Sequence, residues 1–173
     1  MAAHIFLFCL LFAAGSASNE VENGKLCVQG AQEDYIESNW KQCTWKEELN
    51  MNYGLIKSCS FFKKCNNTYL RVFYGGNLRI SDCDYCCKRW YFKLNGKECS
   101  PTIEGVLYMW KGKGTQNIHR HRHIEGYCGN INNGTVNVGF YVGDCNKVNA
   151  GYANSGWNSV SRIVIQEVSP PQT

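Results

Sequence analysis

The residues best suited to binding or reaction chemistry form one run between Ile118 and Ile124, in which histidine and arginine alternate. Successive side chains of a β-strand point to opposite faces, so a strand here would place three histidines on one face and two arginines on the other. Three imidazoles at this spacing suit Zn²⁺ or Cu²⁺ if a further ligand or an open position completes the site. The run is also a basic ribbon suited to sulfated or carboxylated glycans, or a solvated edge strand protected by its charge. We predict no metal site in this run. The residues that are candidates for glycan binding are His119, Arg120, His121, Arg122 and His123.

Cysteine is the second reactive residue type, because the sequence contains 11 Cys. Cys9 lies in the apolar N-terminal segment, and the ten that remain are an even number, which indicates a disulfide framework in an oxidising compartment. Cys83-x-x-Cys86 also has the spacing of a zinc ligand pair, but the sequence holds no second pair of this kind. Cys86 and Cys87 would face opposite sides of a strand, so we expect them to form two separate bridges. The predicted disulfide residues are Cys27, Cys43, Cys59, Cys65, Cys83, Cys86, Cys87, Cys99, Cys128 and Cys145.

The sequence offers no motif for catalysis. It contains neither a Gly-x-Ser-x-Gly elbow nor a His-Glu-x-x-His zinc motif. Nothing in the sequence pairs Glu104 and Glu125 as catalytic carboxylates, and we expect both to be charges at the surface or at a strand end. Trp157, Asn158 and Arg162 could form a binding cluster, but we expect Trp157 in the core and Asn158 in a turn. We therefore predict a protein that is not an enzyme and has no cofactor.

The N-terminus has the order of a cleavable secretory signal, with an apolar run at Ile5–Ala14 followed by small residues up to Ala17. We predict cleavage after Ala17, which gives a signal peptide at 1–17 and a polar N-terminal arm at 18–38. The apolar run is shorter than the roughly 20 residues that cross a bilayer. The mature chain is therefore predicted to be secreted, with no membrane span.

Two N-glycosylation sequons begin at Asn66 and Asn133. In a secreted chain each marks an exposed turn that can carry a glycan. The net charge of +4 is too small for a dedicated nucleic-acid-binding protein and favours acidic glycans or anionic protein surfaces as counterparts. We predict a glycoprotein without a nucleic-acid partner.

Strands must position these residues, because apolar and polar side chains alternate with period two at 69–74 and 135–142. Gly and Asn residues supply the positive φ angles of tight turns. We also expect a short helical turn at 40–49. Further strand candidates are 88–94, 103–109, 118–124 and 160–168, and the expected turns are at 75–76, 95–96, 112–114 and 133–134.

Many short strands separated by regular turns indicate an all-β domain. We predict a disulfide-stapled β-sandwich that is jelly-roll-like, placed at 39–168 and followed by a tail at 169–173.

Seven segments in order along the chain resemble the C-terminal domain of the collagen triple helix repeat containing proteins. They are Asn39–Cys43, Gly76–Ile80, Cys86–Phe92, Asn95–Cys99, Asn117–Arg120, Glu125–Cys128 and Gly156–Arg162. The resemblance implies a jelly roll of the trimeric complement globular-head and tumour-necrosis-factor type. It also implies a secreted extracellular-matrix glycoprotein that binds cell-surface or Wnt-pathway receptor complexes and modulates migration or matrix deposition. The alternative is a structural matrix component that binds acidic glycans and has no receptor of its own.

One departure from the family pattern concerns assembly, because no Gly-X-Y segment stands ahead of the domain in this sequence. A collagen trimer needs glycine at every third position over many repeats, so we expect a homotrimer to form through the domain itself. Cys27 resembles the cysteine that flanks the collagen segment of the family, and Cys65 has no family counterpart. Two arrangements stay open: these two cysteines pair with each other, or Cys27 links two chains.

Overall fold

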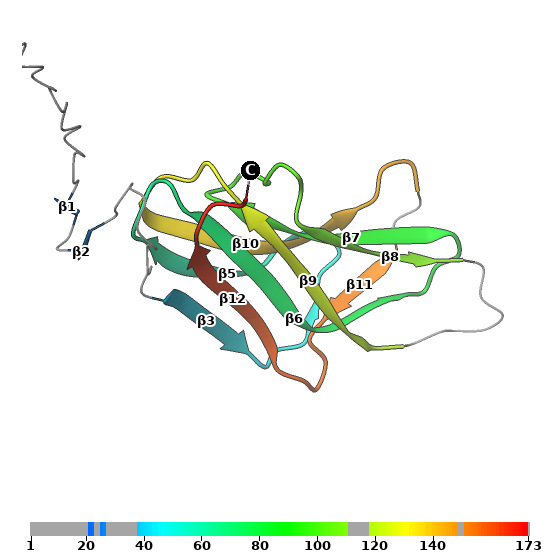
Figure 1. Ribbon diagram of the computed structural model, residues 1–173. Helices are drawn as coiled ribbons and strands as arrows, with labels where there is room; N and C mark the ends of the chain where they lie inside the picture. The colour runs from blue at the N-terminus through cyan, green and yellow to red at the C-terminus, as the bar shows by residue number, and fades with distance from the viewer. Residues whose placement is uncertain (1–20, 23–24, 27–37, 111–117, 149–150, 173) are drawn as a thin grey trace, which may run out of the picture. The chain divides into compact units, whose positions relative to one another are not determined.

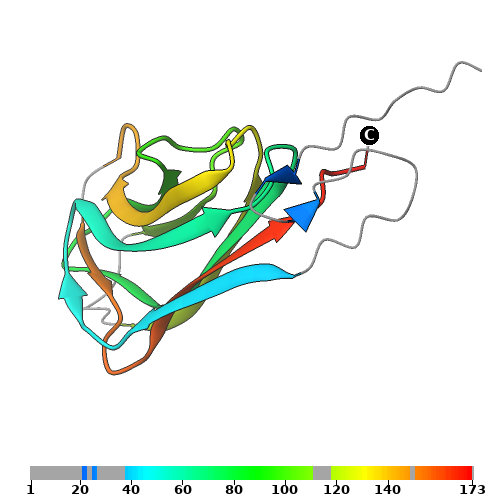
Figure 2. The same cartoon turned by 90° about the vertical axis from the view of Figure 1, so that its left-hand side faces the viewer.

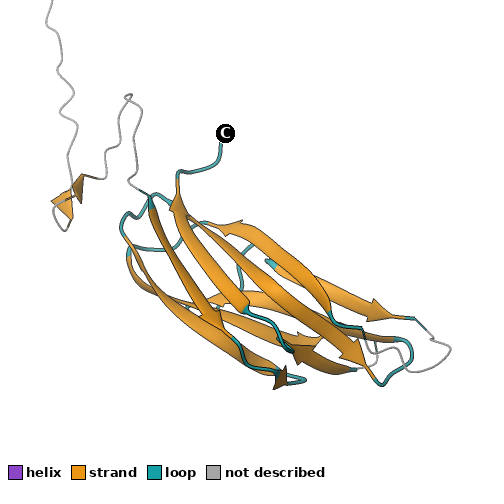
Figure 3. Cartoon of the chain, turned by 90° about the horizontal axis from the view of Figure 1, so that it is seen from below, coloured by secondary structure: helices purple, strands orange, loops and turns teal. Residues whose placement is uncertain are grey.

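The computed structural model describes residues 21–22, 25–26, 38–110, 118–148 and 151–172. Within these residues the regular structure is all β, with no helix (Figures 1 and 3). The chain divides into two units, Met1–Tyr35 and Ile36–Thr173. In the first unit, β1 (Val21–Glu22) and β2 (Lys25–Leu26) pair as a short antiparallel hairpin.

The second unit is built from antiparallel strands. They are β3 (Asn39–Trp45), β4 (Leu49–Asn50), β5 (Gly54–Lys63), β6 (Tyr69–Ser81), β7 (Cys86–Leu94), β8 (Glu104–Met109), β9 (Arg120–Cys128), β10 (Gly134–Asp144), β11 (Tyr152–Ser155) and β12 (Ser161–Val168).

These strands form two sheets that lie as two layers (Figure 2). One sheet has the order β5-β10-β7-β8. In the other, β3-β12-β6 continues into β11 and β4, and β9 pairs with the opposite edge of β6. If the short β4 and β11 are left out, the remaining strands of the second unit can be numbered one to eight along the chain. The first sheet then has the order 2-7-4-5, and the second has the order 1-8-3-6. This is the strand order of a jelly roll, so the predicted disulfide-stapled β-sandwich is confirmed.

The core lies between the sheets, where large aromatic side chains from both layers meet. The rings of Tyr74 on β6 and Phe140 on β10 stack with centroids 4.1 Å apart. Burial raises the pKa of Tyr74 to about 12, against the opposing effect of its hydrogen bond with Ser161. Trp90 is fully buried and donates its indole N–H to Ser155 Oγ at 3.0 Å. The Tyr74 hydroxyl thus has a partner within its own sheet and the Trp90 indole has one across the layers, whereas the buried indole N–H of Trp45 has none among the described residues.

Disulfides fasten the sandwich at several places, and four bridges join the described cysteines. Cys43–Cys59 links β3 to β5 and so connects the two sheets. Cys65 is also disulfide-bonded, whereas Cys27 lies outside the described residues. The other bridges are Cys83–Cys86, Cys87–Cys145 and Cys99–Cys128.

The adjacent pair at the start of β7 forms two separate bridges, as predicted. Cys86 pairs with Cys83 inside one turn, and Cys87 pairs with Cys145 at the end of β10. The Cys-x-x-Cys motif is thus closed on itself as a disulfide, which leaves neither sulfur as a thiolate ligand for zinc.

Two local predictions were wrong. The expected helical turn at 40–49 is instead β3 followed by β4, because Trp45 turns into the core and β3 pairs along β12. The expected turn at Gly75 and Gly76 lies inside β6. A Cβ on Gly76 would come within 2.4 Å of the Tyr74 hydroxyl, so glycine serves close packing there and not a turn.

The other turn predictions fare better. Asn95 and Gly96 both have positive φ between β7 and the next segment, and Gly134 has a φ of 104° at the start of β10. These turns are confirmed, and the predicted turn at 112–114 lies outside the described residues. The sequence pattern did not predict β5, which lies at the edge of the four-stranded sheet.

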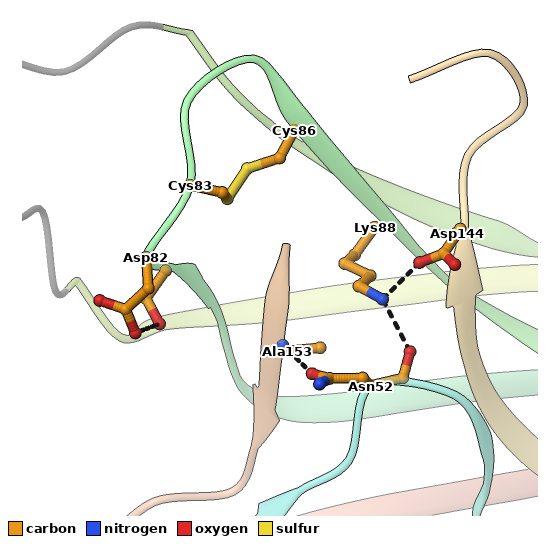
Figure 4. Close-up of a disulfide and its surroundings, with 8 residues drawn as sticks. Asn52, Asp82, Cys83, Cys86, Lys88, Asp144 and Ala153 are labelled. Atoms are coloured by element: carbon orange, nitrogen blue, oxygen red, sulfur yellow. Dashed lines mark hydrogen bonds and ion pairs between the residues drawn. A yellow bond between two sulfur atoms is a disulfide. The ribbon is translucent and has the colours of Figure 1, made fainter. Parts of the chain in front are cut away.

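One buried cation lies near the Cys83–Cys86 turn (Figure 4). Lys88 on β7 is almost fully buried. Its ammonium group donates to the Asn52 carbonyl at 2.8 Å and forms an ion pair with Asp144. The Asn52 side chain in turn accepts the Ala153 N–H at 2.8 Å. This network connects β7, β10 and β11 at one end of the sandwich.

Candidate functional site

The histidine run lies along β9, at the edge of the six-stranded sheet. In this strand Ile124 is buried and faces the core, so Arg122 and Arg120 share its side while His121 and His123 share the outer side. The predicted separation of histidines from arginines is therefore what the strand produces. Lys111 and Lys113, which the sequence places just upstream, lie outside the described residues.

Trp157 is not a core residue, which corrects the prediction. It is 46% exposed, and its ring stacks on His119 with centroids 4.4 Å apart. Trp157 and Asn158 both have positive φ in the turn between β11 and β12, and this backbone geometry accompanies the outward position of the indole. Asn158 lies in a turn, as expected.

A second row of side chains crosses the same outer face. His123 on β9 lies opposite Gly75 on β6, and Gly75 lies opposite Arg162 on β12. A Cβ on Gly75 would meet His123 Cδ2 at 3.5 Å, and the rings of His123 and Phe73 lie 5.4 Å apart. Gly75 is buried beneath the Phe73 and His123 rings and stands between His123 and Arg162 in this row.

We call His119, His121, His123, Trp157 and Arg162 the histidine face. Sequence reasoning treated its members as two clusters, because about thirty residues separate His123 from Trp157. The pairing of β6 with both β9 and β12 brings them to one surface.

The electrostatics differ along this face. Burial lowers the pKa of His119, and Arg79 lowers it further, while Glu48 acts in the opposite direction. Arg71 donates to Glu125 at 2.6 Å, and this hydrogen bond is the main reason why the pKa of Arg71 is raised. The far end of β9 thus carries an ion pair, whereas at the other end Arg79 acts against protonation of His119.

The structure does not assemble a metal site from these residues. Within the described part of the chain, no group of three His, Cys, Asp or Glu side chains is placed to hold a metal ion. The rings of His121 and His123 are 5.4 Å apart in an edge-on arrangement.

The two carboxylates considered for catalysis do not meet. Glu104 on β8 pairs with Arg89, and Glu125 on β9 pairs with Arg71. They belong to different sheets, so each acts as an ion-pair partner within its own sheet.

The predicted glycosylation residues lie together at one end of the domain. The backbone N–H of Asn133 donates to Asn66 Oδ1 at 2.8 Å. Asn66 is exposed and Asn133 is half-buried. Glycans on both residues would therefore lie close to each other at the same end of the domain.

A third surface feature is an exposed aromatic group at the free edge of the four-stranded sheet. The Tyr85 ring meets the Trp110 ring edge-on at 4.8 Å, and the Tyr108 ring lies 6.2 Å from Trp110. Trp110 is 67% exposed, and Val106 and Tyr108 are each at least half exposed. We call Tyr85, Val106, Tyr108 and Trp110 the aromatic edge.

Taken together, these features define a class of protein: a disulfide-bridged jelly roll whose distinctive residues lie on open surfaces suited to binding. Among the described residues, none form a helix long and apolar enough to span a membrane. The family model for the CTHRC1 C-terminal domain matches residues 35–165, and the chain belongs to that family. The family and the disulfide framework place it among extracellular, matrix-associated proteins.

Proposed function

We propose that this protein is a non-enzymatic, secreted matrix glycoprotein that binds cell-surface receptor complexes, including those of the Wnt pathway, and does so as a homotrimer of its domain. Family membership supports the matrix setting. The observation that carries the proposal is the aromatic edge. Aromatic side chains are enriched at protein interfaces, and the outer edge of β8 pairs with no strand among the described residues.

Exposed apolar side chains lie at this edge and also on β3, β5 and β9, where Trp40, Phe62 and Tyr127 are each more than half exposed. The centre of the four-stranded sheet, in contrast, is covered. Tyr91 faces outward on β7, yet it is only 7% exposed. Tyr141 stacks on it at 5.7 Å and the Arg89 guanidinium lies 4.0 Å from its ring centre. The chain therefore covers the middle of this outer face itself, and among its exposed apolar groups we assign the aromatic edge at β8 as the contact surface.

A contact with closed rotational symmetry would bury the aromatic edge without forming filaments. We expect light scattering on the secreted, deglycosylated protein to give the mass of three chains at micromolar concentration. The variant Tyr108→Glu places a charge in the interface and should give monomers. The matched control is Tyr127→Glu, an exposed tyrosine on the edge strand of the other sheet, which should stay trimeric. A wild-type mass of one chain would remove the trimer.

Receptor binding is tested with the same two variants, because we propose that the receptor-binding surface forms only in the trimer. The secreted protein is used to capture cell-surface proteins, which are identified by mass spectrometry, and Tyr108→Glu is compared with Tyr127→Glu. We expect Wnt-pathway receptor components with the wild type and the control, and their loss with Tyr108→Glu. Equal capture by all three proteins would contradict a role for the aromatic edge.

The histidine face supports a second candidate function, binding of acidic glycans. It combines an exposed indole, which can stack on a sugar ring, with histidines and Arg162, which can pair with sulfate or carboxylate groups. Protonation of histidine below about pH 6.5 adds positive charge, so glycan affinity should rise as the pH falls. For His119 this gain comes at lower pH, because its pKa is lowered.

Elution from immobilised heparin tests this function. Arg162→Ala, on the histidine face, should lower the salt needed for elution. Replacing Arg120 and Arg122, on the other side of β9, with alanine should lower it as well, because their charges add to the positive potential that attracts a polyanion. Lys57→Ala on β5 of the other sheet is the matched control for loss of one positive charge and should leave elution unchanged. If the arginine variants elute like the control, the run is a charged edge strand and nothing more.

A further inference from the structure

We propose that the Cys83–Cys86 disulfide is a reducible site, which a dithiol opens by thiol–disulfide exchange while the rest of the domain stays folded. The bridge is the only one of those described that closes within a single turn. Its cysteines are 3 residues apart in sequence, compared with 16, 29 and 58 for the others. A bridge that closes so short a loop constrains the unfolded chain least.

The position of the bridge in the fold explains why it can open alone. Residues 82–85 form the turn that carries the chain from β6 in one sheet to β7 in the other. Cys43 and Cys59 both lie within strands, so hydrogen-bonded backbones would hold those sulfurs close together even after reduction. Cys83 lies outside any strand, as Cys99 and Cys145 also do, but its partner is only 3 residues along the chain, so one short turn can relax once the bond is broken.

The backbone of the turn adds a reason for relaxation. Asp82 has a φ of 55° and Tyr85 a φ of 54°, a left-handed conformation that is costly for a residue with a bulky side chain. These residues immediately precede Cys83 and Cys86. Opening the bridge lets Tyr85 leave this conformation, so the reduced turn gains freedom that a reduced strand would not.

Access to the two sulfurs is unequal. Cys83 is half-buried, whereas Cys86 is fully buried. Gly151 packs against the bridge, since a Cβ there would lie 2.5 Å from Cys83 Sγ and 3.0 Å from Cys86 Sγ. Figure 4 shows the disulfide bridging the turn at its two ends, and the turn residues Asp84 and Tyr85 between the cysteines are exposed, so Cys83 Sγ is the sulfur that we assign as the point of attack.

The exchange balances with a dithiol as the reductant. Its thiolate attacks Cys83 Sγ, the bond between Cys83 and Cys86 breaks, and its electron pair leaves with Cys86 Sγ, which takes up a proton. The second thiol of the reductant, as a thiolate, then attacks the other sulfur of the reductant, which is bonded to Cys83 Sγ in the mixed disulfide. Cys83 is released and protonated, and the reductant leaves as a disulfide. Two electrons have passed to the protein.

Graded reduction of the secreted, native protein with dithiothreitol tests the proposal. Free thiols are blocked with iodoacetamide, the remaining bridges are reduced under denaturing conditions and labelled with a second reagent, and the labels are located by mass spectrometry. Cleavage after Arg79 and Lys88 gives one peptide that carries Cys83, Cys86 and Cys87, so Cys87 is an internal control. We expect the first label on Cys83 and Cys86 at a dithiothreitol concentration at least tenfold lower than for Cys87.

Two results would overturn the proposal: labelling of Cys87 or Cys99 at an equal or lower concentration, or simultaneous opening of all bridges as the protein unfolds. Variants give an independent measurement. Replacing Cys83 and Cys86 together with alanine should leave the β-sheet circular dichroism and the urea midpoint close to those of the wild type. The matched control, replacement of Cys99 and Cys128 with alanine, should lower the midpoint clearly. Equal loss in both pairs would show that the short bridge is a structural fastener.

Discussion

Glu167, near the end of β12, is the group whose replacement should destabilise the domain most through a single polar change. It is only 3% exposed, and its carboxylate accepts four hydrogen bonds. Oε2 accepts from the Asn39 side chain at 2.6 Å and from the Lys64 N–H at 2.8 Å. Oε1 accepts from the Cys65 N–H at 2.8 Å and from the Thr68 hydroxyl at 2.5 Å. One side chain thus joins β3, β12 and the connection from β5 to β6.

The substitution Glu167→Gln keeps the shape and removes two of these bonds. The glutamine oxygen can replace one carboxylate oxygen, but its NH₂ group then faces two donors. If the NH₂ group takes the place of Oε1, the Thr68 hydroxyl can turn to the Cys65 carbonyl, so only the Cys65 N–H loses its acceptor. A buried donor left without a partner costs about 1–3 kcal/mol in the free energy of unfolding. The fully buried ammonium of Lys63 adds to this loss, because Glu167 is the charge that opposes the effect of burial on the pKa of Lys63.

The pH dependence has a definite sign. Burial acts to raise the pKa of Glu167, but its hydrogen bonds outweigh burial and the pKa is lowered from 4.5. The stabilisation by the carboxylate is therefore complete above pH 4.5 and is lost as the pH falls through the lower pKa of the folded state. The glutamine variant should lack this part of the acid dependence.

Urea unfolding at pH 7 and at pH 4, followed by tryptophan fluorescence, measures both effects. The control is Glu125→Gln, which removes a half-exposed ion pair with Arg71 and should cost less than about 1 kcal/mol. A Glu167→Gln variant within about 1 kcal/mol of the wild type at pH 7 would refute the reasoning, as would equal losses in the two variants.

Three further predictions concern other parts of the chain. In urea unfolding, Gly156→Ala should destabilise the domain by roughly 1–3 kcal/mol more than Gly96→Ala. Both glycines have positive φ, but only a Cβ on Gly156 would meet a backbone atom, Glu47 O at 2.2 Å. Histidine NMR should give His119 a titration midpoint below 6.5, since burial lowers its pKa; a midpoint above 6.5 would contradict the placement of its ring. Intact-mass analysis of culture medium should find a chain that begins after Ala17, and a mature chain that still begins at Met1 would disprove the signal peptide.

The sequence predicted the fold class well where strands are long and half-buried. Alternation at 69–74 and 135–142 identified parts of β6 and β10, and the segments at 88–94, 103–109 and 160–168 correspond to β7, β8 and β12. Period-two alternation is a local property of the backbone, so it can be read without knowing which strands pair. The adjacency of Cys86 and Cys87 likewise predicted two bridges from strand geometry alone.

The sequence could not predict features that depend on neighbours distant in the chain. Gly75 and Gly76 have residue types typical of a turn, yet both lie within β6, and a Cβ on Gly76 would come within 2.6 Å of Ser161 Oγ on the paired strand β12. Trp157 is of a residue type expected in the core, but it lies in a turn with positive φ and its side chain is on the surface of the domain.

The candidate site shows the same division. Residues 119–123 alone determined that histidines and arginines lie on opposite sides of β9, because this follows from the period of a strand. The tertiary structure alone decided that Trp157 and Arg162 join those histidines, since β6 pairs with β9 on one edge and β12 on the other. It also decided that Glu167 is a buried hub, because its four donors come from segments that meet only after the two sheets have packed. Local alternation is a property of one strand, but strand order is the outcome of burial over the whole chain.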